Sequence, residues 1–473
     1  MFVILMGGRL YLDYRIEPLI LCSAVIAGFM AWYLRCQWQQ LEEAILNKIN
    51  VAMQGMLIIF SVGCMVGAWM FCGTVPFMVY WGLELVNPNY MLLSAFLICT
   101  LTSCCTCTSW GSAATIGVAM IGIAHGLGIP LAPVAGAALS GCYVGDKLSP
   151  LSDTTNLAPA VAGATTYEHI GHMFYTTIPG TILCCIVFFF ASSSVTGELH
   201  TPAEVQDFMN QLTEIYKLHF LLAVPPLLLI TGSILRWPIL PTIVLTTILS
   251  VALGCLLQGF DLRWGILSTT TGFKVSMTHY LATPTESVQT LLNRGGMMGV
   301  LENMGMLCVA MAFGGIMHGS GMLTVVLQKM LKRVRSDGGL IASTLLSCVV
   351  LCFSTGSAYM GILIPGSLFK ESYLKRRLHP KNLSRALEDS ATMLDGAIPW
   401  ASGAVYMSGV LGVSAFEYVP WMVFNYSSVF IGLACAMLGI GIVKISAEDA
   451  KERLATSQMD TVLIEETPEP VQA

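Results

Sequence analysis

The sequence predicts an all-α polytopic membrane protein with about 10–12 membrane segments of about 20 residues each. Of its 473 residues, 55% are hydrophobic and only 11% are charged, whereas soluble domains carry about 25% charged residues. The mean hydropathy is +0.72, and the apolar residues come in runs long enough to cross a hydrocarbon core of about 30 Å. This composition excludes a soluble enzyme, a nucleic-acid-binding protein and a disordered scaffold.

A first membrane repeat is expected over residues 1–195. Residues 1–12 are apolar but too short to span a bilayer, and they lack the basic start of a secretory signal, so we expect the end of a helix that begins upstream. The segment Gly73–Pro76 breaks a helix at membrane depth, which is tolerated only where the freed backbone groups face protein or a water-filled cavity. The predicted spans are residues 19–34, 53–72, 91–106, 110–124, 130–143 and 173–194.

Residues 196–294 are expected to connect two repeats, through an acidic loop (197–217), two spans near 218–235 and 238–257, and a linker (258–294). The second membrane repeat is expected over residues 295–443, with spans at 295–318, 340–354 and 418–443. Residues 444–473 hold seven acidic and three basic residues without an apolar period. This composition predicts an acidic, disordered tail.

The distribution of charge predicts the orientation in a cell (plasma) membrane. Basic segments at residues 329–335 and 370–385 are expected to lie in the cytoplasm, because lysine and arginine concentrate in cytoplasmic loops. The acidic 197–217 loop is then expected outside.

The two halves share a loose pattern. Each has a break rich in Thr, Ser and Gly, at Thr106–Gly111 and Ser354–Ser357, and each break is followed by an acid-bearing polar stretch. Interrupted segments at corresponding positions of two halves are typical of transporters built from inverted repeats. We therefore expect an inverted-repeat secondary transporter with broken helices and re-entrant hairpins.

The strongest candidate site is the polar stretch Gly145–Asn156, which lies between apolar spans. Burying an ionised carboxylate at the bilayer centre costs about 2.5–3.5 kcal/mol. We therefore expect Asp146 and Asp153 to have charge partners or a functional role. Carboxylate, hydroxyl, amide and backbone oxygens are the ligands of hard cations, by analogy with Ca²⁺ and Mg²⁺. We expect Lys147 to act as a charge partner that neutralises Asp146. The alternative is an ordinary loop with an Asp146–Lys147 contact.

The second-half counterpart runs from Leu387 to Ser402. Its carboxylates, Glu388, Asp389 and Asp395, either contribute to the site or cap a helix, since Asp and Ser favour helix N-termini. The sequence has no nucleophile-elbow, zinc-protease or phosphate-loop motif. We accordingly expect neither enzymatic activity nor a cofactor.

The stretch GDKLSPLSDTTNLAPAVAG (residues 145–163) closely resembles the signature of NhaC-type Na⁺/H⁺ antiporters of the ion-transporter superfamily. That family also includes Na⁺-coupled malate/lactate exchangers. The likeness extends over nearly the whole chain, to GTVP (73–76), TSWGSAATIGVAMIGI (108–123), IPGSLFKESY (364–373), PKNLSRALEDS (380–390) and FEYVPWMVFNY (416–426).

This resemblance implies the residues that bind ion or substrate. In the first half they are Ser109, Asp146, Ser149, Ser152, Asp153, Thr154, Thr155 and Asn156; in the second half they are Ser357, Glu388, Asp389 and Ser390. One stretch departs from the family pattern. Where the family reads something like TSPLIPWNT, this chain has LDGAIPWAS (394–402), which brings in Asp395-Gly396 and Ala401. The departure bears on the choice of cation and organic substrate.

The sequence thus predicts a secondary antiporter in the lipid bilayer that exchanges Na⁺ for H⁺. Asp153, with Asp146, is expected to bind either Na⁺ or a proton, because burial favours the protonated carboxyl and a bound cation favours the ionised one. One alternative on the same fold is exchange of a small carboxylate such as malate or lactate, held at helix N-termini with help from Lys147. A channel is a second alternative. No nucleic-acid partner is expected. The sequence leaves open whether the protein forms a homo-oligomer.

Overall fold

The computed structural model describes residues 16–106, 108–150, 152–195, 202–235, 237–280, 284–332 and 334–454. These residues form helices joined by turns, with an isolated antiparallel bridge between Leu378 and Lys444. The prediction of an all-α protein is confirmed. The N-terminal apolar stretch 1–12 and the tail beyond residue 454 lie outside the described residues.

The first part of the chain contains the helices up to α10. They are α2 (Ile16–Tyr33), α3 (Trp38–Cys72), α4 (Thr74–Leu85), η1 (Pro88–Tyr90), α5 (Met91–Thr106), α6 (Ser109–Ser112), the π-helix η2 (Ala113–Gly117), α7 (Val118–Gly126), α8 (Leu131–Leu148), α9 (Asp153–Ala162) and α10 (Thr166–Val195).

The connecting part contains α11 (Pro202–Ile215), η3 (Phe220–Ala223), α12 (Val224–Ile234), α13 (Ile239–Leu253), η4 (Gly254–Gln258), α14 (Leu262–Thr271), η5 (Val275–Met277), α15 (Glu286–Leu292) and η6 (Met297–Val300). The remaining helices are α16 (Leu301–Gly319), α17 (Met322–Lys332), α18 (Asp337–Thr355), α19 (Ala358–Lys375), α20 (Pro380–Leu387), the π-helix η7 (Glu388–Thr392), α21 (Met393–Asp395), α22 (Ser402–Leu411), α23 (Ala415–Tyr418), η8 (Val419–Trp421) and α24 (Val423–Leu438).

Among the described residues, five helices are long and apolar enough to cross a membrane, or up to eight if each bent pair is one span. One bent pair is α3–α4, where the predicted Gly73–Pro76 break turns the chain by 69°. Gly73 has φ 92°, a left-handed conformation that glycine adopts without a Cβ penalty. Two further apolar helices, Pro18–Tyr33 and Ser402–Leu411, are shorter. Broken helices of this kind are typical of polytopic transporters.

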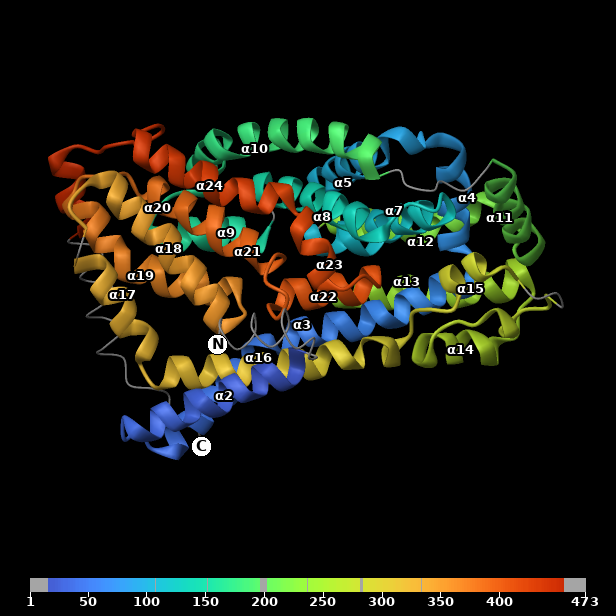
Figure 1. Cartoon of the computed structure of the whole chain (residues 1–473), viewed down its shortest axis with the longest axis horizontal. Helices are drawn as coiled ribbons and strands as arrows, with labels where there is room; N and C mark the ends of the chain where they lie inside the picture. Colours follow the sequence, from blue (N-terminus) through green and yellow to red (C-terminus); the bar gives the residue numbers. More distant parts are fainter. Residues whose placement is uncertain are drawn as a thin grey trace.

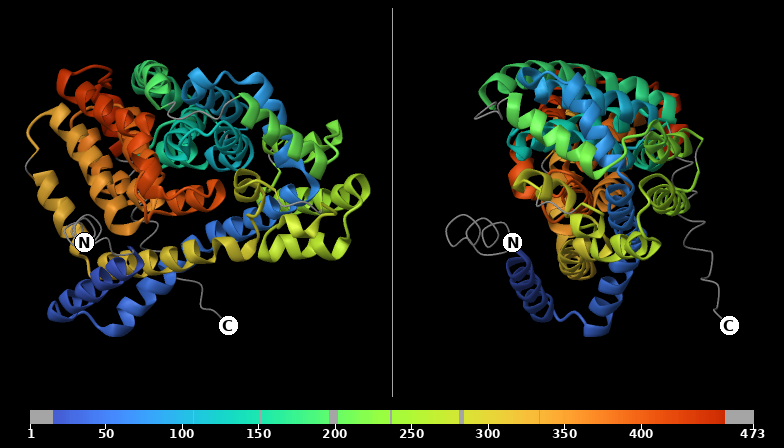
Figure 2. Two further views of the ribbon diagram at one scale, coloured as in Figure 1. Left: turned by 45° about the vertical axis from the view of Figure 1, so that its right-hand side comes forward. Right: turned by 90° about the vertical axis from the view of Figure 1, so that its right-hand side faces the viewer.

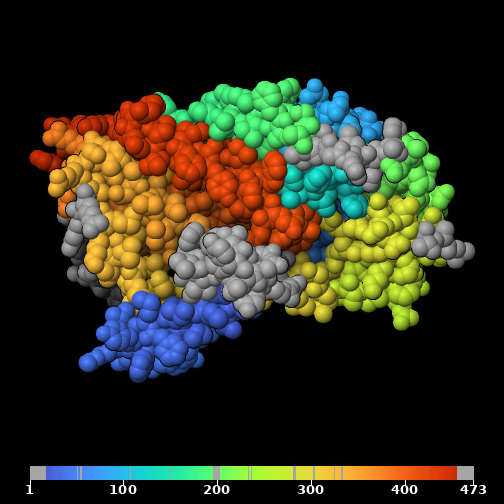
Figure 3. Space-filling model, in the orientation of Figure 1, coloured from blue at the N-terminus to red at the C-terminus, as the bar shows by residue number. Residues whose placement is uncertain are grey.

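The long helices α3 and α16 pack side by side along the long axis of the molecule (Figure 1). Helix α2 and the start of α3 protrude below the body in the other ribbon views and in the space-filling view (Figures 2 and 3). Many large apolar side chains stay exposed on the outer helices, among them Phe29 of α2, Phe190 of α10 and Ile248 of α13. Exposed apolar surface of this extent fits contact with lipid.

The two halves have corresponding elements, α5–α10 and α18–α24. Each contains a sharp extended break, with Thr108 at φ −151° and ψ 132° and Ser357 at φ −146° and ψ 124°. Each then contains a 10-residue helix, α9 or α22, that ends at a left-handed glycine, Gly163 or Gly412. The described residues thus contain the paired breaks that the sequence predicted. The division into repeats at 1–195 and 295–443 stays a prediction.

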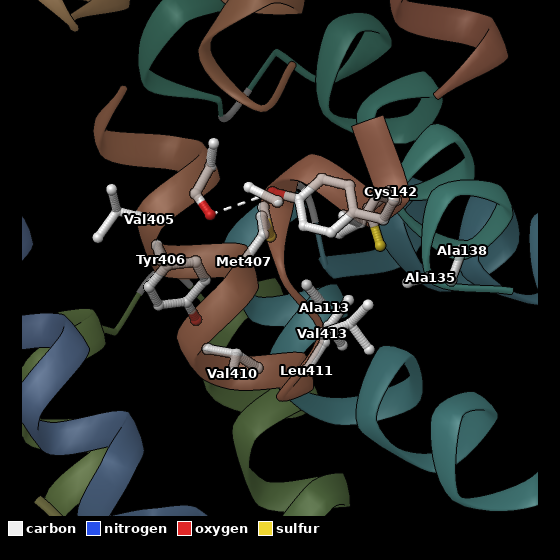
Figure 4. Packing of buried hydrophobic residues seen from close by; sticks show 14 of the residues in the cluster. Ala113, Ala135, Ala138, Cys142, Val405, Tyr406, Met407, Val410, Leu411 and Val413 are labelled. Carbon is white, nitrogen blue, oxygen red and sulfur yellow. Dashed lines mark hydrogen bonds between the residues drawn. The ribbon is translucent and has the colours of Figure 1, made fainter. Parts of the chain in front are cut away.

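Helix α22 is held in the core by apolar packing between the halves (Figure 4). Leu411 of α22 packs against the π-helix η2, where a Cβ on Gly117 would lie 3.2 Å from Leu411 Cδ2. Tyr418 also donates a hydrogen bond from its hydroxyl to the carbonyl of Ala404 at 3.1 Å. These contacts fix where the N-terminus of α22 points.

Three segments are more ordered than the sequence indicated. The predicted acidic loop contains α11, and the predicted linker contains α14 and α15. Residues 444–454, predicted as part of a disordered tail, instead include a bridge and a helical stretch. The amide of Ile445 donates to the carbonyl of Arg377 at 2.9 Å, and Arg453 donates to the carbonyl of Gly163 at 3.2 Å. These hydrogen bonds order a segment that composition alone marked as polar.

Candidate functional site

A cavity of about 810 Å³ lies where the broken helices of the two halves meet. Its lining includes residues at the N-termini of four helices, namely Ser109 of α6, Asp153 of α9, Ala358 of α19 and Ser402 of α22. A helix N-terminus carries a partial positive charge and unsatisfied N–H groups. The cavity is therefore surrounded by groups that stabilise carboxylates.

Asp146 is the buried carboxylate at the first of these breaks. It lies in the last turn of α8 and is 8% exposed. Its Oδ2 accepts a hydrogen bond from the hydroxyl of Ser109 at 2.9 Å, and the backbone of Ser109 and the hydroxyl of Ser152 also hydrogen-bond to it. The backbone carbonyl of Asp146 accepts from Thr155 at 3.1 Å. Residues from α6, α8 and α9 thus converge on one carboxylate.

The rest of the first-half polar stretch shapes the break between α8 and α9. Asn156 donates from Nδ2 to the carbonyls of Pro150 at 2.8 Å and Ser152 at 2.9 Å, which satisfies backbone groups freed by the break. Ser149 is buried in the same stretch. Asp153 is exposed in the first turn of α9, where the helix dipole favours a negative charge, and its side chain lines the cavity.

The sequence matches the model of the "Na+/H+ antiporter family" over residues 141–440. This segment holds the breaks at Pro150 and Ser357 and every cavity carboxylate described above. The chain belongs to the Na⁺/H⁺ antiporter family.

Curated relatives of this antiporter-family chain cover nearly its whole length. It is 39% identical to an uncharacterized Na⁺/H⁺ antiporter of Haemophilus influenzae, over 94% of this chain and 95% of the relative. It is 33% identical to the Na⁺/H⁺ antiporter NhaC of Alkalihalophilus pseudofirmus, over 90% of this chain and 91% of the relative. It is also 33% identical to a malate-2H⁺/Na⁺-lactate antiporter of Bacillus subtilis, over 91% of this chain and 90% of the relative.

Lys147 of this family member contacts a different carboxylate from the one predicted. Its Nζ lies 2.6 Å from Asp389 Oδ1, with exposures of 0% and 1% for the two side chains, and not against Asp146. The hydroxyl of Thr176 donates to the same oxygen at 2.8 Å, and Ser428 also hydrogen-bonds Lys147. Lys147 does not contact Asp146 because the side chains of consecutive residues of α8 point about 100° apart around the helix. Lys147 therefore faces α10, η7 and α24.

The four predicted second-half residues have four different surroundings. Ser357 lines the cavity, whereas Asp389 does not and belongs to the ion pair with Lys147. Ser390 donates to the carbonyl of Ala386 inside its own helix. Glu388 is fully buried and accepts from the hydroxyl of Thr154 at 3.0 Å, which ties the tip of α9 to η7.

The cavity also contains residues outside the set that the family resemblance implied, among them Asp395, Tyr143 and Lys48. Asp395 is 7% exposed, Tyr143 is 2% exposed and Lys48 is 4% exposed, and all three line the cavity. Asp395 had a signal in the sequence, since it replaces the family pattern at that stretch. Tyr143 and Lys48 had none, because Tyr143 lies at the end of a predicted span and Lys48 lies in a segment that was interpreted as a polar connection between spans. Their place in the site follows only from the packing of α8 and α3.

Proposed function

We propose that the chain exchanges Na⁺ for H⁺ across the membrane by competition at Asp146. The observation that carries this proposal is the environment of that carboxylate, which is buried at a helix break, lines the cavity and accepts hydrogen bonds from Ser109 and Ser152. The names of the relatives support the same exchange. Asp153, which the sequence favoured, is exposed and would attract cations into the cavity.

Competition at one carboxylate couples the two fluxes. The ionised carboxylate binds Na⁺ together with hydroxyl oxygens, and protonation removes the charge that holds the cation. If the cavity opens alternately to the two sides, each ion that enters displaces the other. No covalent chemistry is required.

The test uses the purified full chain in proteoliposomes with an imposed pH gradient. Addition of NaCl should collapse the gradient for the natural sequence and not for Asp146→Asn, which keeps the size of the side chain and removes its charge. Glu371→Gln is the matched control, because Glu371 is a surface carboxylate paired with Lys375 at 2.8 Å. Na⁺-driven proton movement that survives in Asp146→Asn would contradict the proposal.

Exchange of a small carboxylate is the second candidate, favoured by Lys48. This ammonium lines the cavity, is 4% exposed and has no hydrogen-bond partner among the described residues. A buried cation without a partner is costly and suits an anionic ligand. Malate and lactate are added after NaCl in the same assay. A response to the organic anion alone, lost in Lys48→Met, would favour this candidate over Na⁺/H⁺ exchange.

We further propose that the protein lies in the plasma membrane with residues 329–335 and 370–385 in the cytoplasm. Arg376 donates from Nη2 to the carbonyl of Val334 at 3.0 Å and from Nη1 to that of Arg335 at 3.2 Å, so the two basic segments are adjacent. Helix α11, in the predicted outer segment, lies at the opposite end of the long axis (Figure 1). Cysteine labelling from either side of the membrane tests this orientation.

A further inference from the structure

The second half of the chain contains a carboxylate in the position that Asp146 holds in the first half. Asp146 precedes Ser152, the N-cap of α9, by six residues (146 to 152), and Asp395 precedes Ala401, the N-cap of α22, by six residues (395 to 401). Asp146 lies in the last turn of α8, Asp395 is the last residue of α21, and both line the same cavity.

The hydrogen bonds of the two carboxylates correspond as well. Asp146 accepts from Ser109, the first residue of α6, and Asp395 accepts from the backbone of Ala358, the first residue of α19. Asp395 Oδ1 also accepts from the hydroxyl of Ser402 at 3.1 Å, just as Ser152 hydrogen-bonds Asp146. Each half thus places one buried carboxylate at two helix N-termini.

Helix capping alone explains these hydrogen bonds but leaves Tyr143 unexplained. The hydroxyl of Tyr143 is buried and has no hydrogen-bond partner among the described residues, although the side chain lines the cavity. Buried hydroxyls in native structures are almost always hydrogen-bonded, so such a group points to a missing ligand. The charges of Asp395 and Asp146 both act on this hydroxyl.

Two glycines let the backbone pass close to Tyr143 and Asp395. A Cβ on Gly396 would lie 2.5 Å from the Tyr143 hydroxyl. A Cβ on Gly403 would touch Asp395 Oδ2 and lie 3.1 Å from the same hydroxyl, and the backbone of Gly403 hydrogen-bonds to Asp395. A carboxylate and an unpaired hydroxyl therefore both lie beside Gly403 without bonding each other. A hard cation that bridged them would lie about 2.3–2.6 Å from each oxygen, by analogy with calcium.

We propose that Asp395, Tyr143 and Ser402 form a second site for a monovalent cation, equivalent to the site at Asp146. The proposal rests on the Na⁺/H⁺ exchange proposed above and adds that two cations bind per transport cycle. The ligands are hard oxygens, one of them ionised, which suits Na⁺. The second carboxylate lies in the stretch where this chain departs from the family pattern, so the site is a property of this chain's own residues.

The test counts bound ²²Na⁺ per purified full chain by scintillation proximity, and measures the sodium dependence of exchange in proteoliposomes. The natural sequence should bind two Na⁺ per chain with a Hill coefficient above one. Asp395→Asn and Asp146→Asn should each bind one. Glu371→Gln, on the surface, should still bind two.

Tyr143→Phe and Gly403→Ala probe the site without removing its charge. Tyr143→Phe removes a hydroxyl that has no hydrogen-bond partner among the described residues, so the melting temperature should hold while sodium affinity at one of the two sites falls about tenfold. Gly403→Ala places a Cβ against Asp395 Oδ2 and should reduce the count to one.

Three results would overturn the second site. They are one Na⁺ bound by the natural sequence, two still bound by Asp395→Asn, or unchanged sodium affinity in Tyr143→Phe. If one Na⁺ is bound and is lost in Asp146→Asn, the second site fails while Na⁺/H⁺ exchange stands. If no Na⁺ binds and NaCl drives no proton movement, the proposed function itself fails.

Discussion

Lys147→Met is expected to destabilise the protein by about 3 kcal/mol, because it leaves Asp389 as a buried charge without its closest partner. Removal of one member of a buried pair costs about 3–5 kcal/mol. Two side chains next to Asp389 keep the expected loss of stability at the lower end of this range. Thr176 still donates to Asp389 at 2.8 Å, and Arg385 lies 3.9 Å from its other oxygen, too far for a hydrogen bond.

The double variant Lys147→Met with Asp389→Asn should recover most of that stability, since replacement of both charges leaves no unpaired ion. Unfolding is measured with a thiol-reactive dye, because Cys142, Cys348 and Cys352 are buried free cysteines that react once exposed. The double variant should also keep Na⁺-driven exchange, because Asp389 does not line the cavity. If the stability losses of the two single variants simply add, the ion-pair argument is wrong. If the folded double variant loses exchange, the pair belongs to the ion path.

Three further outcomes are expected. Gly141→Ala should lower the melting temperature by the equivalent of about 1–3 kcal/mol, because its Cβ would lie 2.9 Å from the backbone nitrogen of Thr100. The control is Gly171→Ala, whose Cβ would have no atom within 4 Å and which should leave the melting temperature unchanged. Ser109→Ala should raise the KM for Na⁺ in proteoliposome exchange about tenfold, and an unchanged KM would exclude a role for its hydroxyl at the site. Thr154→Val should cost about 1 kcal/mol in the dye assay through its lost bond to Glu388, and unchanged stability would contradict this role of the hydroxyl.

The sequence predicted the membrane class and the breaks because both depend on local composition. Runs of apolar residues set the spans, and the Gly73–Pro76 segment lacks the residues that continue a helix, so the 69° bend follows directly. The start of helix α3 was harder to predict. Residues 38–52 are polar enough to read as a connection, yet they contain no proline or glycine, and the helix begins at Trp38.

The partners of the buried charges could not be predicted, because they come from residues far apart in the chain. Lys147 meets Asp389 across 242 positions, and sequence proximity to Asp146 suggested the wrong partner. The polar stretch 145–156 does contribute residues to the cavity, since Asp146 and Ser152 line it and take part in one hydrogen-bonded cluster. Local patterns identify which residues are unusual, and only packing decides which of them meet.

The two break regions correspond more closely in the spacing of their elements than in their residues. Asp146 and Gly163 enclose one unit of a helix end, a break and a 10-residue helix, and Asp395 and Gly412 enclose another of the same length (146 to 163 and 395 to 412, 17 positions each). Identity between these units is low, because one reads DKLSPLSD and the other DGAIPWAS. The backbone conformation is kept because a left-handed glycine and an extended N-cap recur at fixed distances. Two carboxylates thus lie at equivalent places of a shared cavity, and the count of bound ions decides whether both are used.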